Sequence, residues 1–218
     1  MNDRATDQPA PDPADPAEFW EGRYRERPQI WSGNVNATLA ALVDGMPIGT
    51  ALDLGCGEGA DAVWLAERGW QVTAVDISAT ALERGAAQAD RQGLAARIDW
   101  VRRDLSADGV PEGSFRLVAA TFLHSPVELA REEILRGAAA TVAPGGSLVV
   151  IGHAEAPPWA PAPFHERHFP SADETLRALE LAEGEWDVGV CEHRTRTVKD
   201  PDGRPAELID AVVVVRRR

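Results

Sequence analysis

The sequence predicts an α/β fold in which helices cover both faces of an open, mostly parallel sheet that ends in a C-terminal antiparallel hairpin. Short apolar runs alternate with helix-like stretches over 50–152, and a turn signal divides two further apolar runs near the C-terminus. The runs of the central part are continuously apolar, which is typical of strands buried on both faces. Strands that alternate with helices form right-handed βαβ units and hence a parallel sheet.

Five apolar runs, each bounded by Gly, Asp or Pro, are the expected strands of the core: 51–54, 72–75, 98–101, 115–121 and 148–151. Three segments between them are rich in Ala, Leu and Glu and have helical spacing: 61–68, 79–92 and 128–141. Each helix would return the chain to the start of the next parallel strand.

The C-terminal part is expected to contribute one more helix and the hairpin. Ser171 and Glu174 stand at the spacing of a capping box, which predicts a helix over 172–181. The segments 186–198 and 208–216 have the composition of strands. The Asp-Pro-Asp-Gly sequence between them favours a tight turn, so the two strands are expected to pair.

The chain is expected to form a single domain after a short tail. Residues 1–16 are rich in Pro and Asp and lack an apolar stretch, so we expect a disordered tail and no signal peptide. The domain, 17–218, is expected to have three parts: an N-terminal helical cover (17–49, with helices at 18–25 and 34–43), a cofactor-binding core (50–152), and a loop, helix and hairpin on the acceptor side (153–218).

Composition and charge disfavour several classes of protein. An apolar fraction of 44% over 218 residues suits one globular domain with its own core. No apolar run approaches the roughly 20 residues that cross a bilayer, so no membrane partner is expected. A net charge of −13 disfavours nucleic acid as a partner. Cys56 and Cys191 have no metal-like spacing, which favours reduced thiols and a cytoplasmic location. The oligomeric state is open between a monomer and a homodimer.

A glycine-rich turn follows the first expected strand and precedes a helix. Gly55, Gly57 and Gly59 allow the backbone to bend tightly and a ligand to approach without an intervening Cβ. The free N–H groups at the helix start attract the negative end of a ligand. Gly55-x-Gly57-x-x-Ala60 fits the dinucleotide-binding fingerprint. Cys56, inside the turn, is expected to be a small filler beside the ligand.

Carboxylates follow the second and third expected strands. Asp76 ends the second strand, where a carboxylate can accept two hydrogen bonds from a ribose diol. Asp104 follows the third strand and can accept from an exocyclic amine, as on adenine. The carboxyl ends of neighbouring parallel strands share one edge of the sheet, so both acids are expected to border one crevice, together with the residues that follow them, Ile77 and Leu105. The alternatives are a helix N-cap at Asp76 and a solvated loop acid at Asp104.

Together these motifs resemble class I S-adenosylmethionine-dependent methyltransferases, which have a Rossmann-like fold. The resemblance implies that Asp53 and the three glycines hold the methionyl part of the cofactor, that Asp76 holds the ribose and that Asp104 holds the adenine amine. The Ala-Pro-Gly-Gly sequence at 143–146 resembles the turn before the fifth strand in this family. The chain departs from the family at Arg116, since members often carry an Asp early in the fourth strand.

The end of the fourth strand and the segment after the fifth are expected to face the methyl acceptor. Thr121, where the fourth strand ends, is expected to border the cofactor. His124 is a candidate base or orienting group; the alternative is a His that packs and hydrogen-bonds in the loop. His165 and His168 have the spacing of a metal pair but no evident third ligand, so no metal is expected. Three aromatic residues of a proline-rich loop are candidates to roof an apolar pocket: Trp159, Phe164 and Phe169.

Two N-terminal motifs, Phe-Trp-x-x-Arg-Tyr at 19–24 and Trp-Ser-Gly-x-x-Asn at 31–36, resemble the cover of small thiopurine and tellurite-resistance type methyltransferases. In that group an N-terminal Trp packs over the cofactor. The resemblance implies that Trp31 covers the cofactor and that Tyr24 lies near the acceptor. The alternative is that Trp20, Tyr24 and Trp31 only anchor a helix on the core.

The resemblance implies transfer of the methyl group of S-adenosylmethionine to a small molecule by direct in-line displacement, in which the enzyme aligns the reactants and excludes water. The expected acceptor is a thiol, a selenol, a tellurite-like species or a heteroaromatic compound. The alternative is an oxygen or nitrogen acceptor of secondary metabolism. The sequence has neither the N/D-P-P-Y/F motif of amino-methylating DNA enzymes nor an acidic pair after the fourth strand, as in catechol-type enzymes.

Two hypotheses from other classes stay open at this point. A nicotinamide-dependent oxidoreductase would share the glycine turn and Asp76 but would have no use for Asp104. It would also need a catalytic pair such as Tyr and Lys, whereas the single Lys of the chain, Lys199, lies in an expected turn. The other hypothesis is a module that binds the cofactor without catalysis.

Overall fold

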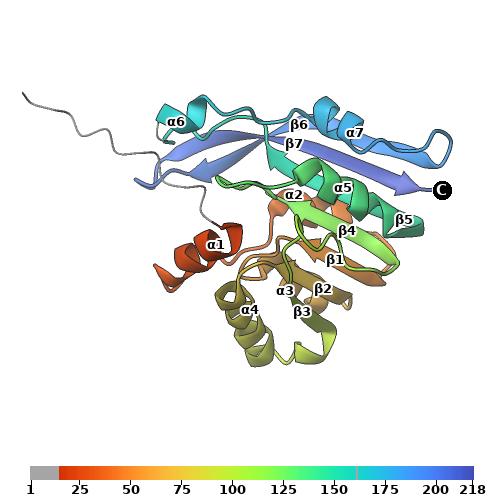
Figure 1. The fold of residues 1–218 in the computed structure, drawn as a ribbon, viewed down its shortest axis with the longest axis horizontal. Coiled ribbons are helices and arrows are strands. Elements are labelled where there is room, and N and C mark those ends of the chain that lie inside the picture. Colours follow the sequence, from red (N-terminus) through yellow and green to blue (C-terminus); the bar gives the residue numbers. More distant parts are fainter. Residues whose placement is uncertain (1–14, 161) are drawn as a thin grey trace, which may run out of the picture.

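The computed structural model describes residues 15–160 and 162–218, which are built around a seven-stranded sheet of order β3-β2-β1-β4-β5-β7-β6 (Figure 1). The strands are β1 (Thr50–Leu54), β2 (Gln71–Asp76), β3 (Ile98–Arg102), β4 (Phe115–Thr121), β5 (Val142–His153), β6 (Trp186–Lys199) and β7 (Pro205–Arg217). The described helices are α1 (Pro16–Arg25), α2 (Ala37–Val43), α3 (Ala60–Glu67), α4 (Ala79–Arg91), a 3-10 turn (Ala95–Arg97), α5 (Arg131–Ala140), α6 (Ala162–His165) and α7 (Ala172–Ala178). The expected open sheet, mostly parallel with a C-terminal antiparallel hairpin, is confirmed.

The order of the parallel strands reverses beside β1. Strand β1 pairs in parallel with both β2 and β4, so the chain moves outward through β2 and β3 on one side and through β4 and β5 on the other. In open α/β sheets, ligands bind outside the carboxyl ends of the strands at such a switch point. The glycine turn that follows β1 therefore lies where this topology places a ligand.

Helix α1 begins at Pro16, two residues before the expected helix and inside the segment expected to be disordered. The Asp15 side chain accepts a hydrogen bond from the Ala17 N–H at 2.8 Å. Pro16 occupies the first helical position, where the backbone N–H that proline lacks would have no partner within the helix. The rest of the expected tail, residues 1–14, lies outside the described residues.

The Ala-Pro-Gly-Gly turn expected ahead of the fifth strand lies within β5. Strand β5 begins at Val142, which pairs with Phe115, and the register shifts before Leu117 pairs with Ser147. A Cβ at Gly146 would stand 2.9 Å from three carbonyl oxygens, so the irregularity requires glycine there. Arg116, which stands where members of the resembling family often carry an Asp, is the second residue of β4.

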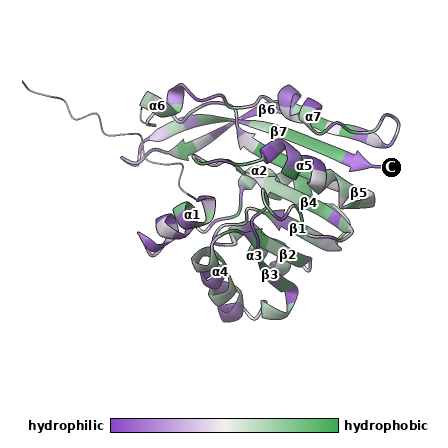
Figure 2. Cartoon of the chain, viewed as in Figure 1, coloured by the Kyte–Doolittle hydropathy of each residue, from purple (hydrophilic) through white to green (hydrophobic). Residues whose placement is uncertain are grey.

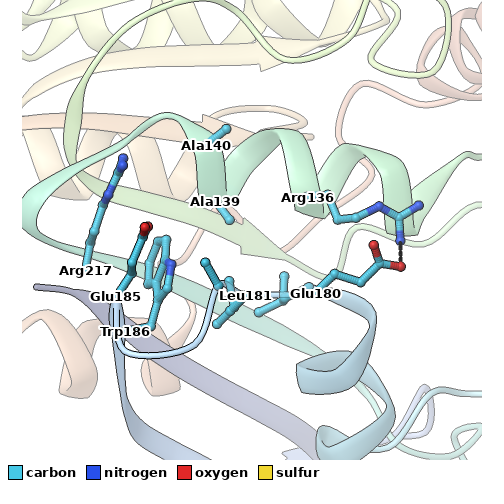
Figure 3. Close-up of a pocket in the computed structure, with 10 residues that line it drawn as sticks. Arg136, Ala139, Ala140, Glu180, Leu181, Glu185, Trp186 and Arg217 are labelled. Carbon is cyan, nitrogen blue, oxygen red and sulfur yellow. Dashed lines mark hydrogen bonds and ion pairs between the residues drawn. The ribbon is translucent and has the colours of Figure 1, made fainter.

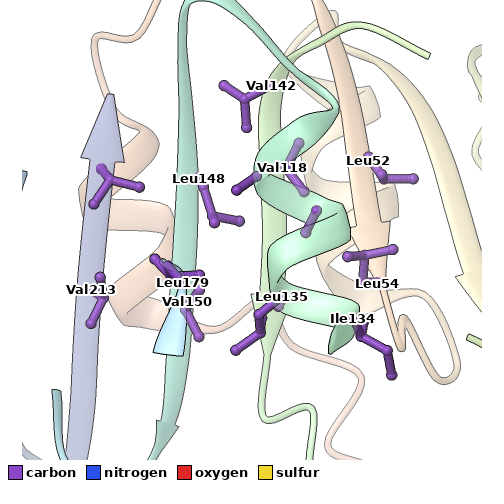
Figure 4. Packing of buried hydrophobic residues seen from close by; sticks show 14 of the residues in the cluster. Leu52, Leu54, Val118, Ile134, Leu135, Val142, Leu148, Val150, Leu179 and Val213 are labelled. Atoms are coloured by element: carbon purple, nitrogen blue, oxygen red, sulfur yellow. The ribbon is translucent and has the colours of Figure 1, made fainter. Parts of the chain in front are cut away.

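Apolar side chains fill both faces of the sheet. On one face, Ile134 and Leu135 of α5 point onto residues of β1, β4 and β5, as Figure 4 shows. On the other face, α2 and α3 bury Leu39 and Leu65. Figure 2 shows that the hydrophobic residues gather on the strands at the centre, whereas α1 and α4 carry hydrophilic residues. Position 161 aside, no helix from residue 15 onward combines the length and apolar character that a bilayer-spanning segment needs.

The C-terminal hairpin extends past the carboxyl end of β5. Pairing between β5 and β7 stops at His153 and Asp210, whereas β6 and β7 stay paired as far as Lys199 and Pro205. Residues 205–209 therefore project beyond β5 by roughly 17 Å at about 3.4 Å per residue. Figure 1 shows this end of the hairpin on the same side of the molecule as α1, away from the C-terminus.

Candidate active site

The turn after β1 has a backbone that only glycine adopts easily. Gly55, Gly57 and Gly59 have φ values of 69°, 54° and 79°, in the left-handed region that L side chains rarely enter. The space around them is also filled. A Cβ at Gly57 would lie 2.9 Å from the Tyr24 hydroxyl, and one at Gly55 would lie 2.7 Å from Leu123. The turn is thus a close junction between β1, the N-terminal cover and the loop after β4.

Asp76, at the end of β2, holds this turn in place. One carboxylate oxygen accepts a hydrogen bond from the Gly57 N–H at 2.8 Å, and the other accepts from the Ser78 N–H at 2.9 Å. Burial raises the pKa of Asp76, while these backbone donors act in the opposite direction. Each carboxylate oxygen has a second lone pair, so Asp76 keeps the capacity to accept from a ribose diol. The ribose role stays a prediction.

Three carboxylates meet beneath the turn: Asp53 on β1, Asp61 on α3 and Asp76 on β2. Asp53 is 1% exposed, and its Oδ2 has no hydrogen-bond partner among the described residues. Burial, followed by the negative charges of Asp61 and Asp76, raises the pKa of Asp53 well above its ordinary value. The cluster therefore lacks positive charge, and a cationic ligand at the turn would supply it.

Asp61 was not among the residues expected in the site. Its two oxygens accept from the Asn36 N–H at 2.7 Å and from the Thr121 hydroxyl at 2.8 Å. It thereby links the start of α2, the start of α3 and the end of β4. Burial raises its pKa, and the two hydrogen bonds oppose that shift. The available sequence signal was an acid in the first turn of the helix that follows the glycines.

Cys56 lies inside the turn and packs against the apolar core. Its backbone N–H donates to the Val75 carbonyl, which ties the turn to β2. Burial, then Asp76 and Asp53, raise the pKa of the Cys56 thiol well above its ordinary value. A thiol so placed stays protonated, which fits the expected role of filler and disfavours a nucleophile.

Asp104 lies beside Asp76 at the ends of two neighbouring strands. Asp76 pairs with Arg102, and the Arg103 N–H donates to the Asp76 carbonyl. One oxygen of Asp104 accepts from the Ser106 and Ala107 N–H groups, so the residue also stabilises its own turn. Next to the two acids, Ile77 is half-buried and Leu105 is buried. Contact of Asp104 with adenine stays a prediction.

The N-terminal cover closes over the glycine turn through Tyr24 and Trp31. The Trp31 indole N–H donates to the Tyr24 hydroxyl at 2.9 Å, directly above Gly57. Tyr24 is 3% exposed, whereas Trp31 is 48% exposed. Burial, followed by the charge of Asp76, raises the pKa of Tyr24, so its hydroxyl stays neutral. The two residues meet above the turn, and the contacts with cofactor and acceptor that the resemblance implies stay predictions.

Partly buried polar contacts join this cover to the glycine turn and to α4, and they were not anticipated. Glu58 accepts from the Ile30 and Trp31 N–H groups at 3.0–3.2 Å and forms an ion pair with Arg84 at 2.8 Å. Arg84 also donates to the Tyr24 carbonyl at 2.7 Å. The ion pair therefore positions both aromatic residues above the turn.

A second anchor joins α1 to the start of α4. The Glu21 carboxylate accepts from the hydroxyls of Ser78 and Thr80 at 2.7 and 2.6 Å. Although burial opposes it, these hydrogen bonds lower the pKa of Glu21 to about 2. Trp20 of the same helix donates to the Ser125 hydroxyl at 3.2 Å, so α1 also reaches the loop after β4.

The loop after β4 begins with a strained residue. Phe122 has φ of 52°, in the left-handed region, and such outliers in non-glycine residues gather at functional sites. Its N–H donates to the Ile151 carbonyl at 2.7 Å, and its ring stacks on His153 with centroids 4.4 Å apart. The end of β4 is thus held against the end of β5.

His124 takes part in packing and hydrogen bonding. Its Nε2 accepts from the His153 backbone N–H at 3.2 Å, and a Cβ at Gly152 would lie 2.8 Å from the same atom. Burial, then the charges of Arg131 and His153, lower the pKa of His124 to about 3. The lone pair that a base would use faces the backbone, so the geometry favours the packing alternative over the base.

The loop after β5 contributes one of its three expected aromatic residues to this region. Phe169 lies edge-on to His124 and His153, with centroids 6.2 and 6.4 Å away. Trp159 and Phe164 are each 39% exposed. The two histidines of the loop have separate partners, since His165 contacts the Ala160 carbonyl and His168 lies 3.4 Å from Glu174.

Two surface hollows lie elsewhere and contain none of the expected cofactor residues. One lies between α5, the start of β6 and the end of β7 (Figure 3). There Arg136 pairs with Glu180 at 3.3 Å, and Trp186 lies beside Leu181. The other lies between α5 and α7. Neither includes the glycine turn, so neither is the expected site.

Residues 51–146 match a family model described as "Methyltransferase domain". An uncharacterized methyltransferase of Mycobacterium tuberculosis is 36% identical over 126 residues, which are 56% of this chain and 60% of the relative. A 2-heptyl-1-hydroxyquinolin-4(1H)-one methyltransferase of Mycobacteroides abscessus is 32% identical over 145 residues, which are 62% and 63% of the two chains. The matched part thus spans about three fifths of these curated relatives.

Solved structures share the fold over most of the chain. One, reported for the conversion of a disulfide bond into a thioacetal group during echinomycin biosynthesis, has a TM-score of 0.70 and 24% identity and covers 92% of both chains. The N-methyltransferase NodS of Bradyrhizobium japonicum, in complex with S-adenosylhomocysteine, has a TM-score of 0.66 and 18% identity and covers 93% of this chain and 99% of its own. The expected Rossmann-like fold is confirmed, and the match over 51–146 supports a methyltransferase that uses S-adenosylmethionine as its cofactor.

Proposed function

We propose that this chain transfers the methyl group of S-adenosylmethionine to a small-molecule acceptor. The observation that carries the proposal is the group of three buried carboxylates beneath the glycine turn, in which Asp53 Oδ2 has no hydrogen-bond partner within 15–160 and 162–218. S-adenosylmethionine brings an ammonium and a sulfonium charge, which this cluster lacks. A nicotinamide dinucleotide brings a pyrophosphate, whose charge Asp53 and Asp61 would repel.

The residues present fit this cofactor part by part. The glycine turn leaves room for a ligand against the backbone, and Asp53 and Asp61 would offset the charge of the methionyl ammonium. Asp76 would accept from the ribose, and Asp104 from the adenine amine. Trp31 and Tyr24 would cover the cofactor and exclude water, which is the principal task of an enzyme in a displacement at carbon.

The bound cofactor supplies an electrophilic methyl group with a neutral thioether as its leaving group. The chain therefore needs no covalent intermediate, and its contribution is alignment and exclusion of water. The hydrogen bond from Thr121 to Asp61 fixes the end of β4 beside the turn. The hydrogen bond from Trp20 to Ser125 holds the following loop under α1. These contacts would set the distance between methyl group and acceptor.

The acceptor is proposed to be a small, uncharged or anionic heteroaromatic compound or thiol. The net charge of −13 disfavours a nucleic-acid acceptor. The relative from Mycobacteroides abscessus, named for a hydroxyquinolinone, supports a heteroaromatic acceptor. The protein of echinomycin biosynthesis, which acts on a disulfide, supports sulfur. A place in the thiopurine and tellurite-resistance subgroup, suggested by the N-terminal motifs, remains part of this proposal.

The test is release of S-adenosylhomocysteine in a panel of acceptors that includes a hydroxyquinolinone, a thiopurine, thiophenol and tellurite. We expect release that depends on one of these compounds and is lost in Asp53→Asn, whose side chain cannot carry the negative charge. Glu207→Gln, on the exposed part of the hairpin, is the matched control and should retain activity. Cofactor binding with no turnover of any acceptor would favour the non-catalytic module.

A further inference from the structure

His153 and Asp210 form a side-chain pair that the cofactor site does not use. His153 is the last residue of β5, and Asp210 lies directly opposite it on β7. The His153 Nδ1 is 3.6 Å from the Asp210 Oδ1. Each of these two atoms is buried without a hydrogen-bond partner among the described residues. The other oxygen of Asp210 accepts from Arg196 at 2.6 Å.

Packing alone gives no reason for a carboxylate at this position. Asp210 is 0% exposed, and the next residues on its face of β7 are Val212 and Val214, so an apolar side chain would suit the sheet. An unsatisfied buried polar atom costs about 1–3 kcal/mol. A short movement of the His153 ring would bring Nδ1–H within hydrogen-bond distance of Oδ1, and such bonds often tighten only when a ligand is present.

The pair stands where the acceptor is expected. Thr121, at the end of β4, pairs with Ile151, two residues before His153. The strained Phe122 stacks on the imidazole, and Arg196 lies 5.2 Å from the Phe122 ring. The side chain of His153 is 26% exposed. Because Nδ1 is buried, that exposure belongs to the other atoms of the side chain.

We propose that His153, oriented by Asp210, accepts the proton of a protic acceptor, a phenol or an N-hydroxy heteroaromatic compound. This inference rests on the proposed function. With Nδ1–H directed at Asp210, Nε2 has the free lone pair that a base requires. The acceptor oxygen bonds to the methyl carbon, the carbon–sulfur electron pair stays with sulfur, and the hydroxyl proton moves to Nε2. Water then removes that proton from the imidazolium.

Charged and titratable groups surround His153 on several elements. Asp210 of β7 lies 3.6 Å from the imidazole, and Arg196 of β6 forms an ion pair with Asp210 at 2.6 Å. His124, in the loop after β4, contacts the His153 backbone through its own Nε2 and so does not compete for the acceptor proton. Arg131, at the start of α5, lies 3.6 Å from a Cβ placed at Gly152 and opposes positive charge on His124.

The test compares 4-methylphenol, which is protonated near neutral pH, with 4-nitrophenol, which is largely ionised at slightly alkaline pH. Removing a general base typically costs 10²–10⁴-fold in rate. We expect His153→Asn to lower turnover of 4-methylphenol by about 10²-fold or more and turnover of 4-nitrophenol far less. His193→Asn, an exposed histidine on β6, is the matched control and should turn over both phenols at the wild-type rate.

Asp210 is a positioning residue that acts through His153, and the pH dependence of the rate tests this role. Loss of its negative charge in Asp210→Asn makes protonation of His153 harder, so the acidic limb of the profile should move to lower pH while the rate at the plateau falls. A purely structural Asp210 would lower the rate without moving the limb. Affinity for S-adenosylmethionine should be unchanged in His153→Asn and Asp210→Asn.

The outcomes separate this inference from the proposed function. Failure of the wild-type protein to bind S-adenosylmethionine overturns both. Cofactor binding together with equal loss, or no loss, for the two phenols in His153→Asn overturns only the base. Turnover confined to thiolates and other acceptors that are already anionic also overturns the base and leaves the proposed function standing.

Discussion

The indole N–H of Trp31 donates to the hydroxyl of Tyr24 at 2.9 Å, and both groups lie within 3.1 Å of the position that a Cβ on Gly57 would occupy. The cover and the glycine turn are therefore parts of one structure. A substitution in the cover or in the turn should therefore alter cofactor binding.

Gly57→Ala should abolish cofactor binding. The new methyl group would meet the Tyr24 hydroxyl at 2.9 Å, and φ of 54° is strained for Ala by about 1–2 kcal/mol. Gly109→Ala is the control, because Gly109 has φ of 70° but no neighbour within 4 Å. Urea unfolding should show a loss from backbone strain in Gly109→Ala and a larger loss in Gly57→Ala, which has the added contact, while calorimetry should show lost binding only for Gly57→Ala. Wild-type affinity in Gly57→Ala would contradict the close contact.

Glu58→Gln should loosen the cover. An amide cannot balance Arg84, and its NH₂ group faces the N–H donors of Ile30 and Trp31. We expect affinity for S-adenosylmethionine to fall roughly tenfold, the scale of one lost charged hydrogen bond. Glu67→Gln is the control, since Glu67 is 45% exposed and lies 3.9 Å from Arg68. Equal affinity in both variants would show that the ion pair does not support the cover.

Asp53→Asn should stabilise the protein in the absence of cofactor at about pH 8. Burial and the neighbouring acids raise the pKa of Asp53 above the ordinary value of 3.8. The folded state therefore binds the proton more tightly than the unfolded state, and wild-type stability falls as pH rises through the raised pKa. Urea unfolding should show an advantage of the variant that shrinks as pH approaches about 4. An advantage independent of pH would contradict the electrostatic origin.

Glu21→Gln should have the opposite pH dependence. Hydrogen bonds from Thr80 and Ser78 lower the pKa of Glu21 to about 2, from an ordinary value of 4.5. Its contribution to stability is complete above that ordinary value and is lost as pH falls toward 2. Thermal unfolding at neutral pH should therefore show a less stable variant, with the difference vanishing in acid. A constant difference across this range would exclude ionised Glu21 as the anchor of α1.

Local sequence patterns were sufficient to predict most of the fold. Continuous apolar runs identified β1 to β5, and the Gly55–Gly59 turn identified the edge of the sheet at which the ligand is expected. The position of β7 inside the sheet and β6 at its edge also has a sequence basis, since 211–215 is wholly apolar whereas β6 carries charged residues along its length. The start of β5 was predicted too late in the chain. The expected turn at 143–146 is instead an irregularity within β5, where the pairing with β4 shifts its register.

The side-chain partners of the site could not be predicted in the same way. The contacts of Glu58 with Arg84, of Asp61 with Thr121 and of His153 with Asp210 join residues from different elements. The order of the strands and the packing of α3 and α4 bring these residues together, which no local pattern shows. His124 was a reasonable candidate base from its position after β4. Its Nε2 is engaged by the β5 backbone, which no local pattern indicates.

Isothermal titration of the wild-type protein and Asp76→Ala with S-adenosylmethionine and with NAD tests most directly whether the turn and its buried acids form a site for a cationic nucleoside. The structure predicts that S-adenosylmethionine binds the wild type, that Asp76→Ala loses roughly 1–3 kcal/mol of this binding, and that NAD binds neither protein. Binding of NAD without binding of S-adenosylmethionine would contradict the assignment of the site and the activity proposed from it.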